Sequence, residues 1–142
     1  MSVSRAAEFA KMVFDRTINS NTFGKCLKNI KLVSVGDGNC KAEFTVQDEH
    51  LNLGGTLHGG FTSTLIDCIS TYAVMTHGNG SPGVSVDLHV TFMKAAFPGD
   101  NVFIDARTIR AGKSLAFLEV ELKKDDGAII ARGQHTKFIA SG

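Results

Sequence analysis

The sequence contains no block of like charges and no long apolar run. The net charge is +1 over 142 residues, and charged residues make up 20% of the chain. Nucleic-acid-binding proteins usually show a basic stripe or a strongly basic balance, so we expect no nucleic-acid partner. A helix needs about 18 apolar residues in succession to span a bilayer. The runs here are far shorter, and we expect no transmembrane segment.

Cysteine is scarce, and its three positions are scattered. Cys26, Cys40 and Cys68 form no C-x-x-C pair, which is typical of free thiols in a reducing compartment and argues against a disulfide framework or a zinc site. The five histidines include no pair at the i, i+4 spacing of a helical metal site. We therefore predict that the protein binds no metal.

A secretory signal is also lacking, because the first residues contain no continuous apolar stretch. They do place Arg5, Lys11 and Arg16 among apolar residues, as mitochondrial presequences do. Glu8 and Asp15 argue against a presequence, because transit peptides are poor in acidic residues. We expect a cytoplasmic protein, with the mitochondrion as the alternative location.

Length and composition predict a single globular domain over residues 1–142, without repeats or linkers. Apolar spacing predicts a short amphipathic helix from about Ser4 to Ile18. A longer central helix is predicted from apolar residues that recur every three or four positions: Phe61, Leu65, Cys68, Ile69, Tyr72 and Met75. Most of its other positions are small or hydroxylated, so we expect other structure to wrap this helix over most of its surface.

Alternating patterns predict six strands, two before the central helix and four after it. The first two form a hairpin near residues 36–39. The clearest alternation runs from Val84 to Phe92, with Val84, Val86 and Leu88 on the face opposite Ser85 and Asp87. The predicted fold class is α+β, an antiparallel sheet wrapped around one long helix.

A glycine pattern at residues 78–83, Gly-Asn-Gly-Ser-Pro-Gly, matches the dinucleotide-binding pattern G-x-G-x-x-G. In dinucleotide-binding proteins this pattern follows a strand and opens a helix, whose N-terminus holds the pyrophosphate. Here it follows a predicted helix and opens a predicted strand. We therefore predict no cofactor.

The stretch from His50 to Gly60 is unlike ordinary structural sequence. Gly59 and Gly60 lie where the central helix begins, and the unpaired N–H groups and dipole of a helix start favour negative charge. Because the two glycines have no side chains, a ligand can approach the backbone closely here. The Gly59 N–H could then stabilise an oxyanion, with the Asn52 side chain as a second donor. Alternatively, the glycines only allow a tight turn, and Asn52 caps it.

Asp67 lies two turns into this apolar, hydroxyl-lined helix. A carboxylate in such a place is costly unless it is hydrogen-bonded or functional. It could act as a general base on water or as a nucleophile that forms a transient anhydride, and the sequence leaves both open. The structural alternative is that Thr71 or another hydroxyl neutralises it.

The run from His58 through Gly59-Gly60 to Asp67, with Asn52 upstream and residues 83–87 downstream, resembles the signature of hotdog thioesterases related to 4-hydroxybenzoyl-CoA thioesterase. The resemblance covers nearly the whole chain. It implies the hotdog fold, and the hydrolysis of medium- or long-chain fatty acyl-CoA without a cofactor. It also implies a homodimer with a continuous sheet, commonly paired again into a homotetramer.

The same resemblance implies the roles of individual residues. Asn52 and Gly59 would polarise the thioester carbonyl, while Asp67 and Ser85 would orient and activate water. The residues expected to contact acyl-CoA are His58, Asp87, Phe92, Met93, Lys94, Arg110, Gly112, Lys113, Ser114 and Lys137. The lysines and the arginine among them are candidates for binding the CoA phosphates. The chain departs from the family pattern at Lys94-Ala95, where relatives carry Ser-Pro, and at Phe138, where they carry histidine.

Two other functions compete with this one. A hydratase or dehydratase of the same fold pairs a catalytic histidine with the acid on the helix, and the predicted helix holds no histidine beside Asp67. An acyl-CoA-binding protein without activity needs no carboxylate at Asp67. Release of free thiol from palmitoyl-CoA would separate the three functions.

The spacing between Gly59 and Asp67 predicts how the site is built. Eight residues of helix separate them by about 12 Å along the axis, whereas a thioester carbonyl and its attacking water need partners within about 3 Å. Two antiparallel helices across a two-fold axis can meet this requirement. We predict shared sites, with Asn52 and Gly59 from one chain and Asp67 and Ser85 from its neighbour.

Overall fold

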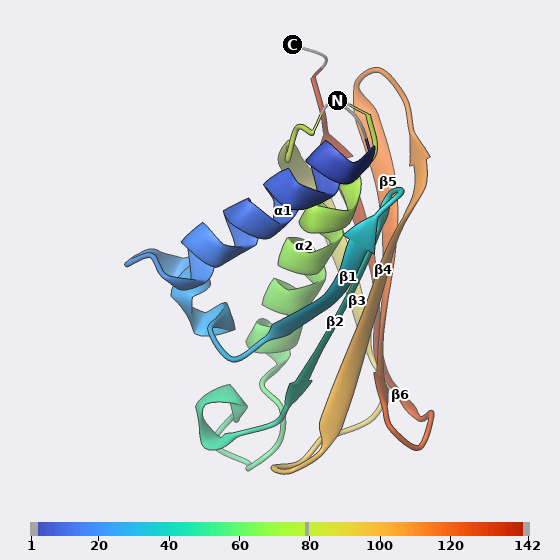
Figure 1. Cartoon of the computed structure of the whole chain (residues 1–142). Coiled ribbons are helices and arrows are strands. Elements are labelled where there is room, and N and C mark those ends of the chain that lie inside the picture. Colours follow the sequence, from blue (N-terminus) through green and yellow to red (C-terminus); the bar gives the residue numbers. More distant parts are fainter. Residues whose placement is uncertain (1–2, 79, 141–142) are drawn as a thin grey trace.

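The computed structural model describes residues 3–78 and 80–140, so Asn79 of the glycine pattern lies outside the described residues. Two α-helices, α1 (Val3–Ile18) and α2 (Gly59–Met75), lie on the same side of one sheet (Figure 1). Two short 3-10 helices, η1 (Phe23–Leu27) and η2 (Asp48–His50), lie in the connections. Among the described residues no helix has the length and apolar character that crossing a membrane requires.

The sheet has six antiparallel strands in the order β1-β2-β4-β5-β6-β3. Their bounds are β1 Lys31–Gly36, β2 Asn39–Thr45, β3 Val84–Phe92, β4 Asn101–Ala111, β5 Leu115–Lys124 and β6 Ile129–Phe138. This arrangement confirms the predicted α+β class and hotdog fold. The strand β4 extends to Ala111, and the turn to β5 follows it.

The central helix α2 is covered as predicted. Its apolar face packs on the inner face of the sheet, where Leu65, Ile66 and Ile69 are fully buried. On another side α1 lies across it, and Phe14 meets Tyr72 edge-on with 5.6 Å between ring centroids. Few positions of α2 therefore face water, which is why small and hydroxylated residues replace charged ones along it.

Strand β3 lies at an edge of the sheet, and most of its apolar residues are exposed. Val84, Val86 and Phe92 are 64%, 57% and 58% exposed, respectively. Among the described residues β3 has a neighbour on one side only, so these side chains stand at an open edge of the sheet. Exposed edge strands with apolar side chains readily pair with another chain, and proteins usually protect them.

A β-bulge on β3 decides which way Ser85 points. The pairing of β3 with β6 shifts register between Ser85 and Asp87, which leaves Val86 as an extra residue. Strict alternation would put Ser85 beside Asp87, on the face opposite Leu88. Because of the bulge, Ser85 instead points towards α2, where its hydroxyl contacts His135. Periodicity alone therefore assigned Ser85 to the wrong face.

Candidate functional site

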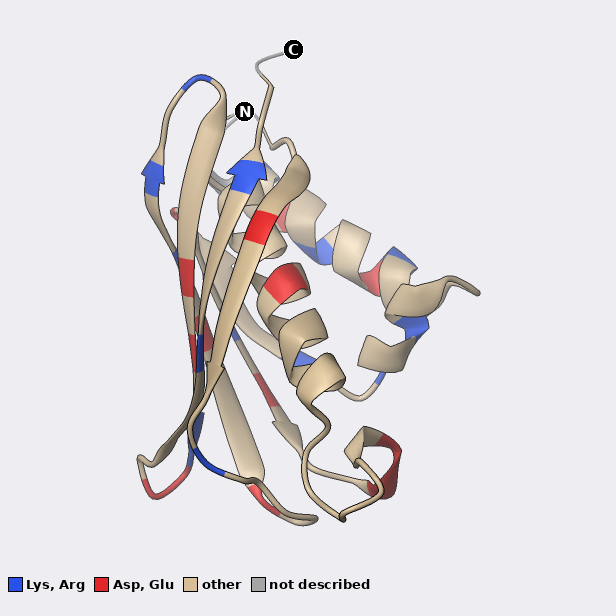
Figure 2. Ribbon diagram, turned by 180° about the vertical axis from the view of Figure 1, so that it is seen from behind, with Lys and Arg blue, Asp and Glu red and all other residues tan. Residues whose placement is uncertain are grey.

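Asp67 is the single charged residue of α2, and Figure 2 shows it as one acidic position on an otherwise uncharged helix. Its side chain is 47% exposed. In the described part of the chain no group hydrogen-bonds to its carboxylate. The Thr71 hydroxyl donates instead to the backbone carbonyl of Asp67, at 2.7 Å. Thr71 therefore does not neutralise the carboxylate, which is free to act on a ligand.

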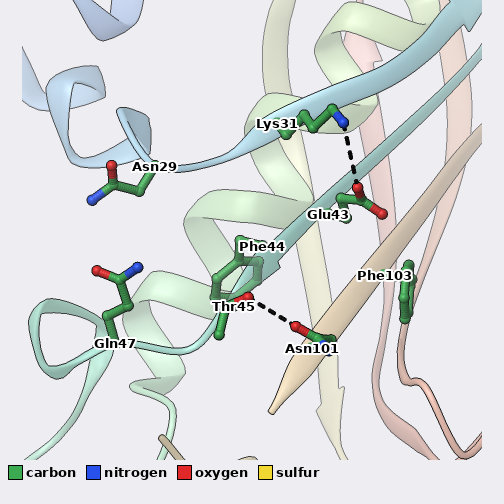
Figure 3. A pocket seen from close by; sticks show the side chains of 8 residues that line it. All are labelled: Asn29, Lys31, Glu43, Phe44, Thr45, Gln47, Asn101 and Phe103. Carbon is green, nitrogen blue, oxygen red and sulfur yellow. Dashed lines mark hydrogen bonds and ion pairs between the residues drawn. The ribbon is translucent and has the colours of Figure 1, made fainter. Parts of the chain in front are cut away.

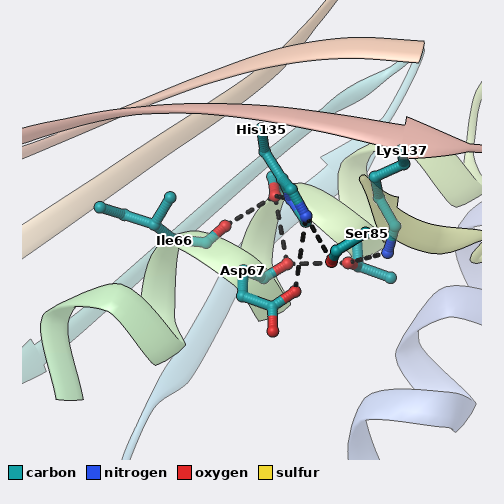
Figure 4. Close-up of polar contacts among 7 residues, drawn as sticks. Ile66, Asp67, Ser85, His135 and Lys137 are labelled. Atoms are coloured by element: carbon teal, nitrogen blue, oxygen red, sulfur yellow. Dashed lines mark hydrogen bonds and ion pairs between the residues drawn. The ribbon is translucent and has the colours of Figure 1, made fainter. Parts of the chain in front are cut away.

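His135 of β6 joins Asp67 to Ser85 (Figure 4). Its Nε2 lies 2.7 Å from Ser85 Oγ and 3.8 Å from Asp67 Oδ1. Sequence analysis did not select His135, although a signal was present: it shares the inward parity of Ala131 and Gly133 on its strand, where a polar side chain is unusual. The histidine is 1% exposed, so it acts within the protein and not on solvent.

The hydrogen bonds fix where the protons of this group lie. The Ser70 hydroxyl is 2.6 Å from the carbonyl of Ile66, to which it must donate, and 2.8 Å from His135 Nδ1. Because a hydroxyl has one proton, Ser70 accepts from Nδ1–H. In neutral His135, Nε2 is then an acceptor, and Ser85 donates its proton to it. The lone pairs of Ser85 Oγ remain for another donor.

The surroundings of His135 favour this neutral form. Burial lowers its pKa from the ordinary value of 6.5, and the nearby Lys137 charge lowers it further. Asp67 and Asp87 oppose these effects but are weaker. At neutral pH the imidazole is therefore uncharged and accepts the Ser85 proton.

Asn52 lies in the loop before α2, and its side chain caps a turn, as the alternative interpretation expected. Its Oδ1 accepts from the Thr56 N–H at 3.1 Å, and its Nδ2 donates to the Thr56 hydroxyl at 2.9 Å. The backbone donor fixes which end of the amide is oxygen. An amide nitrogen has two N–H groups, so the turn uses one and leaves the second for a ligand. Capping and ligand binding are therefore compatible.

The two glycines at the start of α2 have different surroundings. The His58 side chain caps the helix, because its Nδ1 accepts from the Phe61 N–H at 3.1 Å. A β-carbon on Gly60 would lie 2.7 Å from this ring, so glycine at 60 makes room for the cap. A β-carbon on Gly59 would make only ordinary contact with Phe92. Among the described residues nothing accepts from the Gly59 N–H, so this donor stays available to a ligand.

The expected acyl-CoA contacts fall at two ends of the molecule. Phe92, Met93 and Lys94 line a hollow of about 340 Å³ beside the first turn of α2. Residues 110–114 lie at the β4–β5 turn, at the opposite end of the sheet (Figure 1). One chain therefore does not bring these two groups together.

Three other expected contacts differ from one another. His58 is exposed and serves as the helix cap, while Asp87 is exposed on the face of β3 that points away from α2. Lys137 is buried, with Nζ 2.6 Å from Thr71 Oγ1. A phosphate in solvent cannot reach this amine, so the structure does not support Lys137 as a phosphate ligand.

A larger open hollow, of about 490 Å³, lies over β1, β2 and β4 (Figure 3). None of the expected site residues lines it; the lining residues are Asn29, Lys31, Glu43, Phe44, Thr45, Gln47, Asn101 and Phe103. Its polar side chains are paired with one another: Lys31 forms an ion pair with Glu43, and Thr45 donates a hydrogen bond to Asn101. The candidate site is therefore the region along α2 and not this hollow.

Comparison with known proteins agrees with this geometry. The family model for the thioesterase superfamily matches residues 54–131. Human acyl-coenzyme A thioesterase 13 is 44% identical over 123 residues, which cover 86% of this chain and 88% of the human protein. The structure of zebrafish thioesterase superfamily member 2 superposes with a TM-score of 0.90 at 40% identity, covering 94% of this chain and 98% of that one. The mouse member 2 structure gives 0.82 at 38% identity, covering 99% and 100%.

Proposed function

Because the chain belongs to the thioesterase superfamily, we propose that it hydrolyses acyl-CoA thioesters, with medium- or long-chain fatty acyl groups as substrates. The observation that carries the proposal is the contact of Ser85 and Asp67 with the same nitrogen of His135. The names of the similar proteins support acyl-CoA as the substrate class. The chain-length range rests on the family resemblance.

In the proposed mechanism, a water molecule lies between Asp67 and Ser85. Ser85 uses its own proton on His135, so its oxygen can only accept from the water. One water proton then points to Ser85 Oγ and the other to the Asp67 carboxylate, which leaves a water lone pair directed at the thioester carbonyl. Asp67 takes the proton as the water oxygen bonds to the carbonyl carbon.

This arrangement favours the general base over the nucleophile for Asp67. A carboxylate that attacked the carbonyl itself would leave Ser85 without a role in that first step, because no water takes part in it. The two routes differ in where oxygen from solvent appears during one turnover. In ¹⁸O-labelled water with excess enzyme, a base places the label in the fatty acid. Label in the Asp67 side chain, which enters when water attacks the Asp67 carbonyl of an anhydride, would show the nucleophile.

The oxyanion that forms on the carbonyl carbon needs donors that are already in place. The Gly59 N–H and the second N–H of Asn52 supply two. As the tetrahedral intermediate collapses, the C–S bond breaks and the CoA thiolate leaves. No metal or other cofactor takes part in this proposal.

We place these two halves of the site on different subunits of a homodimer. Gly59 and Asp67 belong to one continuous helix and stand about 12 Å apart along it. The open edge of β3 supports pairing with a second copy, since no other described strand lies beside its backbone groups there and its apolar side chains are exposed. Antiparallel pairing across a two-fold axis would bring the α2 start of one chain near the Asp67 of the other. A homotetramer would pair two such dimers.

Hydration of the acyl chain is a second candidate function, and one observation favours it. A hydratase needs a histidine beside the acid on the helix, and α2 holds none. Strand β6 nevertheless places His135 next to Asp67. However, His135 is 1% exposed, and both of its nitrogens are bonded to protein hydroxyls. A substrate cannot reach it, so hydrolysis remains the better-supported function.

The test is incubation of the purified protein with palmitoyl-CoA and a thiol reagent. Steady release of free CoA supports hydrolysis. With an enoyl-CoA as substrate, loss of the conjugated double bond without thiol release would support a hydratase instead. Saturable binding with neither reaction would leave an acyl-CoA-binding protein, and the proposal would be wrong.

A further inference from the structure

Lys137 of β6 carries a buried amine that the mechanism above does not use. The residue is 4% exposed, and its Nζ lies 2.6 Å from the Thr71 hydroxyl (Figure 4). Lysine is almost never fully buried unless it is paired, because moving an ammonium out of water is costly. Its position beside α2 therefore calls for an explanation.

The hydrogen bonds from Lys137 run in one direction. An ammonium only donates, so Thr71 Oγ1 accepts from Nζ and its own proton goes to the Asp67 carbonyl at 2.7 Å. The chain Lys137–Thr71–Asp67 thus holds the turn of α2 from which the Asp67 carboxylate projects. Among the described residues the Lys137 amine forms no ion pair with the Asp67 carboxylate, so it acts on that residue through Thr71.

The positive charge of Lys137 also acts on the titratable side chains around it. Two titratable side chains face it from α2: Asp67 and Cys68. Burial raises the pKa of Cys68 to about 12, so at neutral pH this thiol is uncharged and Asp67 is the negative neighbour. From its own strand Lys137 acts on His135, whose other charged neighbours are Asp67 and Asp87.

We propose that Lys137 is a positioning residue for water activation: through Thr71 it holds the turn of α2 that carries Asp67. Its charge also acts on His135, the acceptor of the Ser85 proton. The inference rests on the proposed hydrolytic function. Protonation of His135 would turn Nε2 into a donor and take away the acceptor for the Ser85 proton. Lys137 opposes this protonation because two positive charges repel in a site of low dielectric constant.

Three variants separate the two roles. Lys137→Met removes the charge and the hydrogen bond, Thr71→Val removes the hydroxyl but keeps the charge, and Lys28→Met removes a lysine whose side chain is 62% exposed. Two readouts are followed: the NMR titration of the His135 ring, and the pH profile of kcat/KM for palmitoyl-CoA hydrolysis.

In Lys137→Met we expect the His135 midpoint and the acid limb of kcat/KM to move together to higher pH, by roughly half to one unit. Thr71→Val should lower kcat while KM and the His135 midpoint stay near those of the wild type. Lys28→Met should change neither readout. If Lys137→Met does not fold, Thr71→Val carries the test, and an unchanged kcat in that variant would overturn the proposal.

A His135 midpoint in folded Lys137→Met that coincides with the wild-type value would also overturn it. The NMR titration does not depend on turnover. Absence of palmitoyl-CoA hydrolysis by the wild type would therefore refute the proposed function, whereas an unmoved His135 titration would refute the role of Lys137.

Discussion

Gly133 of β6 and Ile66 of α2 are in such close contact that a β-carbon on Gly133 would lie 2.5 Å from Ile66 Cγ2. Any larger residue at 133 forces the Ile66 side chain or α2 itself to move. Ile66 precedes Asp67, and Gly133 lies two residues before His135. The same contact therefore sets the distance between the carboxylate and the histidine.

Gly133→Ala should destabilise the fold and lower activity together. Overpacking of this kind costs about 1–3 kcal/mol in the free energy of unfolding, measured by urea denaturation. Adding Ile66→Ala removes the three clashing carbons, so the double variant should be more stable than the sum of the two single effects predicts. Simple additivity would contradict the contact.

Asp67→Asn should lower kcat by about 10²–10⁴-fold, because the general base is lost. The fold should remain intact, since the carboxylate is half exposed and no described residue hydrogen-bonds to it. Asp105→Asn, on the exposed outer face of the sheet, is the matched control and should keep full activity. An Asp67→Asn enzyme that keeps more than a few per cent of wild-type kcat would rule out general-base catalysis by this residue.

Asn52→Ala should lower kcat by about 10²-fold or more, the usual effect of losing an oxyanion donor. KM should change less, because this interaction strengthens in the transition state. Thr56→Val is the comparison variant, because it removes the hydroxyl that orients the Asn52 amide but leaves the amide in place. Its kcat should fall less than that of Asn52→Ala. A large rise in KM at constant kcat would instead make Asn52 a ground-state binding residue.

Mixed dimers test whether the site is shared. Asn52→Ala and Asp67→Asn chains are each expected to be inactive and are refolded together in equal amounts. About half of the dimers are then mixed, and each mixed dimer has one intact and one doubly altered site, so activity should return to about a quarter of the wild-type level. Native mass spectrometry of chains with different tags shows whether mixed dimers form. If they form and remain inactive, the site lies within one chain.

Stability should fall as the pH drops below neutrality, partly through His135. Its folded-state pKa lies below the ordinary value of 6.5 because of burial, so the unfolded chain takes up the proton first. The stability from neutral His135 is complete above about pH 6.5 and is lost as pH falls towards the folded-state pKa. His135→Gln should flatten this dependence in urea titrations at pH 7.5, 6.5 and about 5.5.

Much of the fold follows from local spacing in the sequence. The three-to-four spacing of apolar residues predicted α2 and its buried face correctly. A helix that packs on the core along one side needs apolar residues at every third or fourth position. The start of α2 at Gly59 and the isolated carboxylate of Asp67 were visible for the same reason. Each is an exception to a regular local pattern.

The rest was decided by the tertiary structure. One extra residue in β3 turned Ser85 towards α2, and a one-residue shift reverses the face of a strand without changing its composition. His135 meets Ser70 and Ser85 across 65 and 50 residues of sequence, and Lys137 meets Thr71 across 66. The sequence by itself determined which residues are unusual in their elements. Only the folded chain determined which of them touch, because strand pairing and helix packing bring distant positions to hydrogen-bonding distance, and no local period records such pairs.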